Sequence, residues 1–315
     1  MLIYIGKRIG TLIIILLGLS FMTFGLVYLL PSGPATILLE SMGAGADPEV
    51  IAKINAEYGY DQPFLVQYVN WLLNVLQGDF GKSIQYAQPV SEVLARKLPN
   101  TVTLAVSSFI LMIAIAFPFG IVSAMNHKKP LDTVIRLLSF IGISIPSFWF
   151  GMILIYLLSV QLKWLPVSGG GSFKHLIMPS ITLAVSLAAM YVRRIRTAML
   201  EQINAPYVTS ETARGLKRGA IIGWHVLPNS FLTLVTYLGM SFGYLLGGTA
   251  IVETLFSWNG IGQAAVDAIS GRDYHLIQGY VLWMGCIFVI VNLLVDISYR
   301  FLDPRIRLAV QKNEQ

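Results

Sequence analysis

One stretch of the sequence has residue types that could bind a nucleotide phosphate, namely GDFGKS at residues 78–83. A P-loop surrounds phosphates with backbone N–H groups and a lysine, and it needs a glycine five residues before the glycine of its Gly-Lys pair. That position is Leu76, within a stretch that has the apolar spacing of an amphipathic helix. We therefore expect no ATP site in this chain, so any ATP that drives it must be bound by another subunit.

Catalytic and metal-binding patterns are also missing from the sequence. It contains one cysteine and four scattered histidines without metal-ligand spacing, and it has no GxSxG, no HExxH and no clustered carboxylates. The sequence thus predicts no catalytic residue, no metal ligand and no cofactor bound by this chain. An intramembrane enzyme would need polar catalytic pairs within its spans, and none is visible.

Two acidic residues lie next to apolar sequence and are candidates for function. Asp296 is followed four residues later by Arg300, which predicts a helical ion pair, although a carboxylate at membrane depth is otherwise a functional candidate. Glu253 follows Gly247 and Gly248 in LLGGTAIVETLF. The glycine pair favours close helix packing. Together with Glu253 it is also a candidate for a pore or its outer vestibule, whereas Glu253 could instead be solvated or cap a helix.

The elements that position these residues follow from composition. The chain has 315 residues, 55% hydrophobic and 12% charged, with a mean hydropathy of +0.68, which is too apolar for one water-soluble core. Six runs are long enough to cross a bilayer as helices. The sequence therefore predicts an all-α integral membrane protein with six transmembrane helices, at residues 9–30, 101–125, 131–160, 178–192, 231–251 and 277–299.

Basic residues predict the orientation. With the N-terminus inside, 15 of the 22 Lys and Arg residues fall on the same side as that terminus. Because cationic loops resist translocation, this side should be cytoplasmic and should contain both termini. The net charge of +6 is then explained by topology, and no basic patch interleaved with aromatics indicates nucleic-acid binding.

Three local patterns predict structure outside regular spans. Asp47 and Pro48 should open a helix that Gly59 closes, and FLVQYVNWLLNVLQ should form a second amphipathic helix on the outer face. Pro146 should break the third span. In the longest cytoplasmic loop, YVTSETARGLKRGAIIGWHVLPNS predicts a short helix, a break at Gly215 where positive φ costs little, and a second short helix leading into the fifth span.

This loop resembles the signature loop of ATP-binding-cassette importer permeases. Gly215 is followed after nine residues by His225, and then by Leu227 and Pro228. The Glu-Ala-Ala of that family falls on the residues Thr209, Ser210 and Glu211.

Four further stretches are similar to permeases of the dipeptide, oligopeptide and nickel importer group. They are YGYDQPFLVQYVNWLLNVLQGDFGKS, PVSEVLARKLPNTVTLAV, LLGGTAIVETLFSWNGIGQAAVDAI and NLLVDISYRFLDPRIR. Asn259 and His275 depart from the pattern, because proline is expected at both positions, and local loop shape there should differ.

The resemblance implies a type I importer permease of the bacterial cytoplasmic (inner) membrane. Its expected parts are a first helix with an outer amphipathic segment (1–95), a permease core (96–304) whose coupling loop covers about 193–229, and a cytoplasmic tail (305–315). The implied partners are a second homologous permease in a heterodimer, two cytosolic ATPases that hold ATP and Mg²⁺, and an extracytoplasmic solute-binding protein. The cargo is either a peptide or nickel or a metal chelate. The alternative is a self-contained secondary transporter, which should show inverted repeats.

Overall fold

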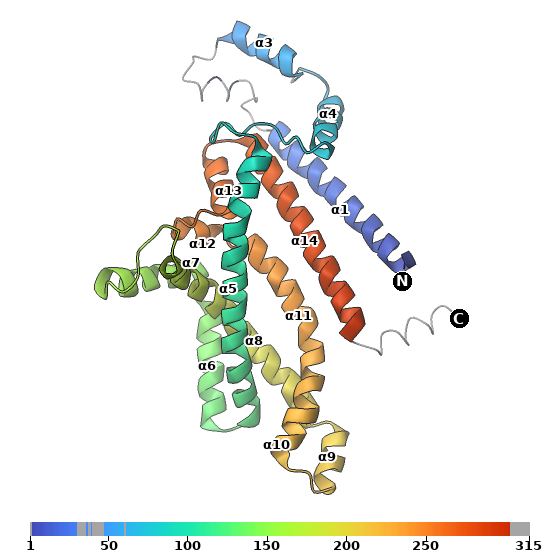
Figure 1. Ribbon diagram of the computed structural model, residues 1–315, viewed down its shortest axis with the longest axis vertical. Helices are drawn as coiled ribbons and strands as arrows, with labels where there is room; N and C mark the ends of the chain where they lie inside the picture. The colour runs from blue at the N-terminus through green and yellow to red at the C-terminus, as the bar shows by residue number, and fades with distance from the viewer. Residues whose placement is uncertain (1, 30–35, 37–38, 40–46, 60, 303–315) are drawn as a thin grey trace. The chain divides into compact units, whose positions relative to one another are not determined.

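The computed structural model describes residues 2–29, 36, 39, 47–59 and 61–302, and every named element within them is a helix (Figure 1). This confirms the all-α prediction for the described residues. Large apolar side chains are exposed along the helices, for example Ile14 at 71% and Leu138 at 59%. Such exposure suits a lipid environment, in which apolar surface needs no protein cover. The chain divides into two compact units.

The first unit contains the described residues up to Thr101 together with Asn259–Val289. Its helix α1 spans Leu2–Tyr28, α3 spans Pro48–Tyr58 and α4 spans Phe64–Leu76. Asp47 caps α3 by accepting from the Glu49 N–H at 3.0 Å, and Gly59 ends it with a φ of +70°. Both predicted helices are therefore confirmed. Asp47 and a left-handed Gly59 determine the ends of α3, whereas α4 begins after Pro63 without a side-chain cap. The position of both helices on the outer face stays a prediction.

Aromatic rings hold α4 against α1. Phe24 of α1 lies 5.6 Å from Phe64 and 5.3 Å from Trp71, measured between ring centroids, and the Ser20 and Tyr68 hydroxyls are 2.9 Å apart. Such ring pairs add to the stability that burial alone supplies.

The remainder of the first unit packs around the start of α5 (Val90–Met125), α13 (Ile261–Ser270) and the start of α14 (Tyr274–Leu302). Asp273 precedes α14 and is fully buried. Its carboxylate accepts from the Ser83 hydroxyl at 2.5 Å and from the backbone N–H groups of Gln85 and Leu276 at 3.1 and 3.2 Å. The core consists of Val90, Val93, Leu94, Ile261, Ala264, Ala268 and Leu276.

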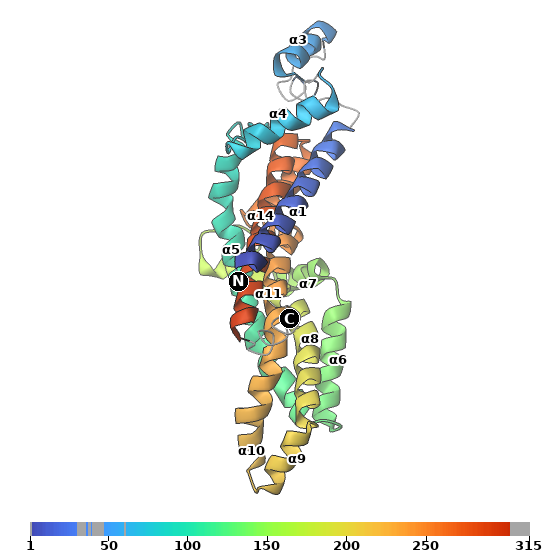
Figure 2. The same ribbon diagram turned by 90° about the vertical axis from the view of Figure 1, so that its right-hand side faces the viewer.

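The second unit contains Val102–Trp258 and the described residues from Ile290 onward. Its helices include α6 (Pro130–Ser144), α7 (Ser147–Leu154), the π-helix η1 (Ile155–Gln161), α8 (Phe173–Ile203), α11 (Leu227–Gly248) and α12 (Ala250–Leu255). Helices α6 and α8 run side by side in both views (Figure 1, Figure 2).

Glycines allow close packing against α8 within this unit. A Cβ atom added at Gly142 of α6 would lie 2.9 Å from the Cβ of Ala189 in α8. One added at Gly120 of α5 would lie 2.7 Å from the Cβ of Ile195. Both distances are too short for a real side chain, so α5, α6 and α8 approach closely only because these positions are glycine.

Four described helices are long and apolar enough to cross a membrane, or five if a helix pair bent by 100° counts as one span. The four are Gly10–Tyr28, Val90–Met125, Phe173–Ile203 and Tyr274–Val295, and the bent pair is Pro130–Ser144 with Ser147–Gln161. The bend confirms the predicted break at Pro146.

Helix α11 occupies the place of the predicted fifth span and has 22 residues. The count of six spans, the cytoplasmic position of both termini and the three-part division of the chain stay predictions.

The helix that contains the predicted fourth span, 178–192, is longer than that span. Helix α8 has 31 residues and continues through Arg193, Arg194 and Arg196 to Ile203. Charged side chains end a hydropathy run, but arginine is a good helix former, so hydropathy underestimates the length of such a helix.

Candidate coupling elbow

The elbow is the segment between α8 and α11, and its first half is α9, Pro206–Ala213. The N–H of Gly215 donates to the Thr212 carbonyl at 3.0 Å, and the N–H of Leu216 donates to the Glu211 carbonyl at 3.2 Å. This pair of bonds is a Schellman motif, which satisfies the last carbonyls of a helix and requires a left-handed residue. Gly215 has a φ of +83°, which confirms the predicted glycine break.

The second half of the elbow leads directly into α11. It consists of α10 (Arg218–Ile221) and the π-helix η2 (Ile222–Val226), after which Leu227 and Pro228 begin α11. Within the second unit, α9 and α10 lie beyond the ends of α8 and α11 (Figure 1).

Two contacts anchor the base of this second half. The side chains of Ile221 and Val226 are buried. The Ser230 hydroxyl lies 2.7 Å from the Val226 carbonyl and 3.4 Å from the Ala198 carbonyl of α8. The start of α11 is therefore attached to the end of α8.

A contact between a histidine and a carboxylate joins the two halves of the elbow. His225 Nδ1 of η2 lies 3.1 Å from Glu211 Oε1 of α9. The other carboxylate oxygen of Glu211 is buried and has no hydrogen-bond partner among the described residues. Both residues belong to the loop pattern in the sequence, but their contact crosses the glycine break and could not be read from spacing.

The other predicted elbow residues have separate surroundings. Thr209 is exposed, and the hydroxyl of exposed Ser210 donates to the Pro206 carbonyl at 3.3 Å. Leu227 is half-buried and Pro228 is exposed. The structure thus brings Glu211 and His225 together and leaves Thr209 and Ser210 on the outside of α9.

The exposed side of the elbow carries a feature that sequence reasoning missed. Trp224 is 80% exposed and Leu216 is 43% exposed. The exposed Arg214, Lys217 and Arg218 lie nearby in sequence. The tryptophan that follows the basic residues of this loop is the signal in the sequence, because a large exposed aromatic ring is more typical of a contact surface than of a connector.

The candidate vestibule residues lie at the end of α11 and in α12. Glu253 is fully buried, and its Oε1 accepts from the Thr249 hydroxyl at 2.8 Å. The alternative of a solvated Glu253 is therefore wrong for this chain. Gly248 is the last residue of α11. Gly247 is exposed, and among the described residues nothing lies within 4 Å of an added Cβ, so the close packing expected of Gly247 is not found in that part of the chain. The side chains of Asp296 and Arg300 lie outside the described part.

Both departures from proline make contacts within the first unit. Asn259 accepts a hydrogen bond from the Lys97 ammonium through its side chain and one from the Asn100 amide, at 2.7 Å, through its carbonyl. His275 lies against Gly81, where an added Cβ would be 2.9 Å from His275 Nδ1. These two positions thus supply side-chain contacts that proline could not make.

Comparison with known families identifies the chain. Residues 116–308 match the model described as binding-protein-dependent transport system inner membrane component, and residues 1–105 match the N-terminal model of the same systems. The chain belongs to this family. It is accordingly a multi-pass permease component of the bacterial inner membrane, as the sequence predicted.

Curated relatives match over nearly their whole length. The glutathione transport system permease protein GsiC of Salmonella choleraesuis (strain SC-B67) is 38% identical over 98% of this chain and 99% of its own. The oligopeptide transport system permease protein AppB of Bacillus subtilis (strain 168) is 37% identical over 96% of this chain and 98% of its own.

Two solved structures share the fold. The first is a chain of the MetNI methionine ABC transporter in inward-facing conformations. It gives a TM-score of 0.57 at 17% identity, and the match covers 67% of this chain and 96% of that chain. An amino acid ABC transporter solved with histidines gives a TM-score of 0.52 at 17% identity, covering 68% and 94%. At this identity the likeness concerns the fold alone.

Proposed function

We propose that this chain is one of two pore-forming permeases of an ATP-driven peptide importer, and that its elbow transmits the work of an ATPase. The observation that carries the proposal is the elbow itself. It is a compact helix–glycine–helix unit, joined internally by the Glu211–His225 pair and attached at its base to α8.

The family description implies a binding protein, and a binding protein must deliver its cargo to a pore. The expected assembly contains a second homologous permease, two cytosolic ATPases that hold ATP and Mg²⁺, and the solute-binding protein on the outer side. This family membership disfavours the secondary-transporter alternative, which needs no binding protein.

The elbow suits coupling because it is stiff within itself and exposed at its tip. An ATPase that binds Trp224 and Leu216 would move both halves together, because the contact between Glu211 and His225 and the Schellman motif resist their separation. Movement of the elbow would reach α8 and α11 together, because the contact between Ser230 and the Ala198 carbonyl joins these two helices. The pore would open outward when the ATPases close.

Peptides are the proposed cargo. Curated relatives at 36 to 38% identity are named for glutathione, oligopeptide or peptide transport, and glutathione is itself a tripeptide. The nickel or metal-chelate alternative has no such support. Among the described residues, no group of three His, Cys, Asp or Glu side chains could hold a metal ion.

The first test asks whether coupling needs the left-handed turn at Gly215. Gly215→Pro removes the N–H that donates to Thr212 and forces φ near −65°, so the Schellman motif cannot form. We expect normal membrane insertion and loss of both ATPase association and peptide uptake. Gly215→Asn should retain most activity, because asparagine tolerates left-handed φ and nothing lies within 4 Å of the added Cβ.

A matched control is Gly219→Ala, in α10, where the added Cβ also meets nothing and φ is not left-handed. The tagged chain would be purified from native membranes, and its partners identified by mass spectrometry. Normal uptake by a well-expressed Gly215→Pro variant would refute the coupling role. A chain that is purified alone and still transports would refute the importer assignment.

A further inference from the structure

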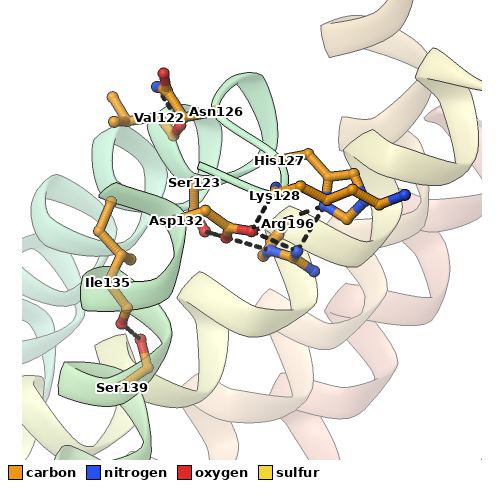
Figure 3. A network of polar contacts seen from close by, with 9 residues as sticks. All are labelled: Val122, Ser123, Asn126, His127, Lys128, Asp132, Ile135, Ser139 and Arg196. Carbon is orange, nitrogen blue, oxygen red and sulfur yellow. Dashed lines mark hydrogen bonds and ion pairs between the residues drawn. The ribbon is translucent and has the colours of Figure 1, made fainter. Parts of the chain in front are cut away.

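A polar network centred on a buried carboxylate joins the turn between α5 and α6 to α8 (Figure 3). Asp132, in the first turn of α6, is 2% exposed. Its Oδ1 accepts from Arg196 Nε at 2.7 Å, and its Oδ2 accepts from Arg196 Nη2 at 2.8 Å. A forked pair of this kind fixes orientation as well as distance, because both bonds must align at once.

The same carboxylate also orders the turn. The Ser123 hydroxyl of α5 donates to Oδ1 at 2.6 Å, and the backbone N–H of Lys128 donates to Oδ2 at 3.3 Å. Lys128 has a φ of +66°, a strained value for a lysine. Arg196 Nη2 also lies 2.9 Å from His127 Nδ1. Asp132 therefore connects three helices, α5, α6 and α8, through one side chain.

The network lies close to the base of the elbow. Ala198, whose carbonyl is contacted by Ser230 of α11, follows Arg196 by two residues on α8. Helix α8 ends at Ile203, and α9 begins at Pro206. A displacement of the elbow therefore reaches Arg196 through about two turns of continuous helix.

Apolar packing alone leaves this junction able to slide. Gly120 of α5 and Gly142 of α6 approach α8 closely without interlocking side chains of their own. Packed helices of this kind can make small shear movements. A forked ion pair at the end of the same interface opposes such sliding, because any shift of α8 along α6 breaks both of its bonds.

We propose that Asp132 and Arg196 form a positioning pair of the transport cycle. They fix the α5–α6 turn to α8, so that α6 moves with the base of the elbow as one body. This inference rests on the proposed coupling function. Helix α6 is the first half of the helix pair that bends sharply before α7. The pair would thus carry movement of the elbow into the bent helix.

The first experiment measures this attachment directly. Spin labels are placed at Lys129 and Glu201, both exposed, in a Cys286→Ser background, and their distance distribution is recorded in the purified complex. We expect one narrow distribution whose mean is the same without nucleotide and after trapping with ATP and vanadate. A shift of the mean between the two states would overturn the proposal.

Variants then test the pair itself. Asp132→Asn and Arg196→Gln should each broaden the distribution, and Arg196→Lys, which retains the charge but loses the fork, should give an intermediate width. The double variant should be less perturbed than either single one, since no buried charge is left unpaired. Asn126→Ala is the control, because its amide donates only within the turn, to Val122 at 2.9 Å. Variants as narrow as the parent chain would overturn the proposal.

A second readout separates positioning from folding. The complexes are reconstituted with radiolabelled trialanine or glutathione, and peptide transported per ATP hydrolysed is measured. For Asp132→Asn this ratio should fall about tenfold, the size of a typical coupling between two sites, while ATP hydrolysis per folded complex stays near that of the parent. A parallel loss of both rates indicates a folding role alone and would contradict the proposal.

The outcomes also distinguish this inference from the proposed function. If the purified chain brings no ATPase with it, the importer assignment fails, and the label distances in the chain alone still show whether the pair fixes the turn to α8. If the complex transports peptide and the variants match the parent in distance and ratio, only the positioning role fails.

Discussion

Replacing Asp273 with alanine should release the loop between α4 and α5. The carboxylate caps α14 through the Leu276 N–H and accepts from the Ser83 hydroxyl and the Gln85 N–H, all at 2.5 to 3.2 Å. Loss of an N-cap costs about 1 kcal/mol, and each donor left without its partner costs about 1 kcal/mol or more. The free energy of opening this loop should therefore fall by about 3 kcal/mol, which corresponds to roughly a hundredfold.

Hydrogen exchange in detergent or nanodiscs measures this opening. Two loop amides report on it, those of Ser83 and Val90, which donate to the carbonyls of Gln88 and Gly81 at 2.9 and 3.0 Å. Peptides that contain these amides should exchange about a hundredfold faster in the variant, because exchange follows the local opening equilibrium.

The matched control is Asp79→Ala in the same loop. Asp79 accepts one exposed N–H, from Gly81 at 2.8 Å, so its loss should change exchange only a few-fold. Equal exchange in the Asp273 variant and the parent chain would refute the view that this carboxylate holds the loop.

Three further changes have expected outcomes. Gly142→Leu should lower the melting temperature strongly, because overpacking the α6–α8 contact costs about 1–3 kcal/mol. The control Gly223→Leu should not lower it, because an added Cβ at Gly223 meets nothing within 4 Å. Equal melting temperatures for the two variants would contradict the close approach of α6 to α8. Lys97→Met should destabilise the first unit by about 1–2 kcal/mol through loss of the bond to Asn259, and unchanged thermal unfolding would refute it. Trp224→Ala, at an 80% exposed side chain, should leave melting unchanged but reduce ATPase recovered with the chain, and full recovery would argue against a contact role.

Local features of this protein could be predicted from its sequence. Hydropathy located the apolar helices, and Asp47 and Gly59 set the ends of α3 because capping bonds join residues only a few positions apart. The helix–glycine–helix form of the elbow followed from Gly215 for the same reason. The family was also identified from the sequence, through several short motifs in the same order along the chain.

The tertiary structure alone decided which distant polar groups meet. Asp132 and Arg196 are 64 positions apart, and Ser83 and Asp273 are 190 apart, so no local period relates them. Glu253 was a vestibule candidate from its position alone, and only the fold shows that its side chain is buried and accepts from the Thr249 hydroxyl. Hydropathy and capping depend on near neighbours along the chain. A buried carboxylate depends instead on which helix faces pack together, because the carboxylate is stable only where that packing supplies its donors.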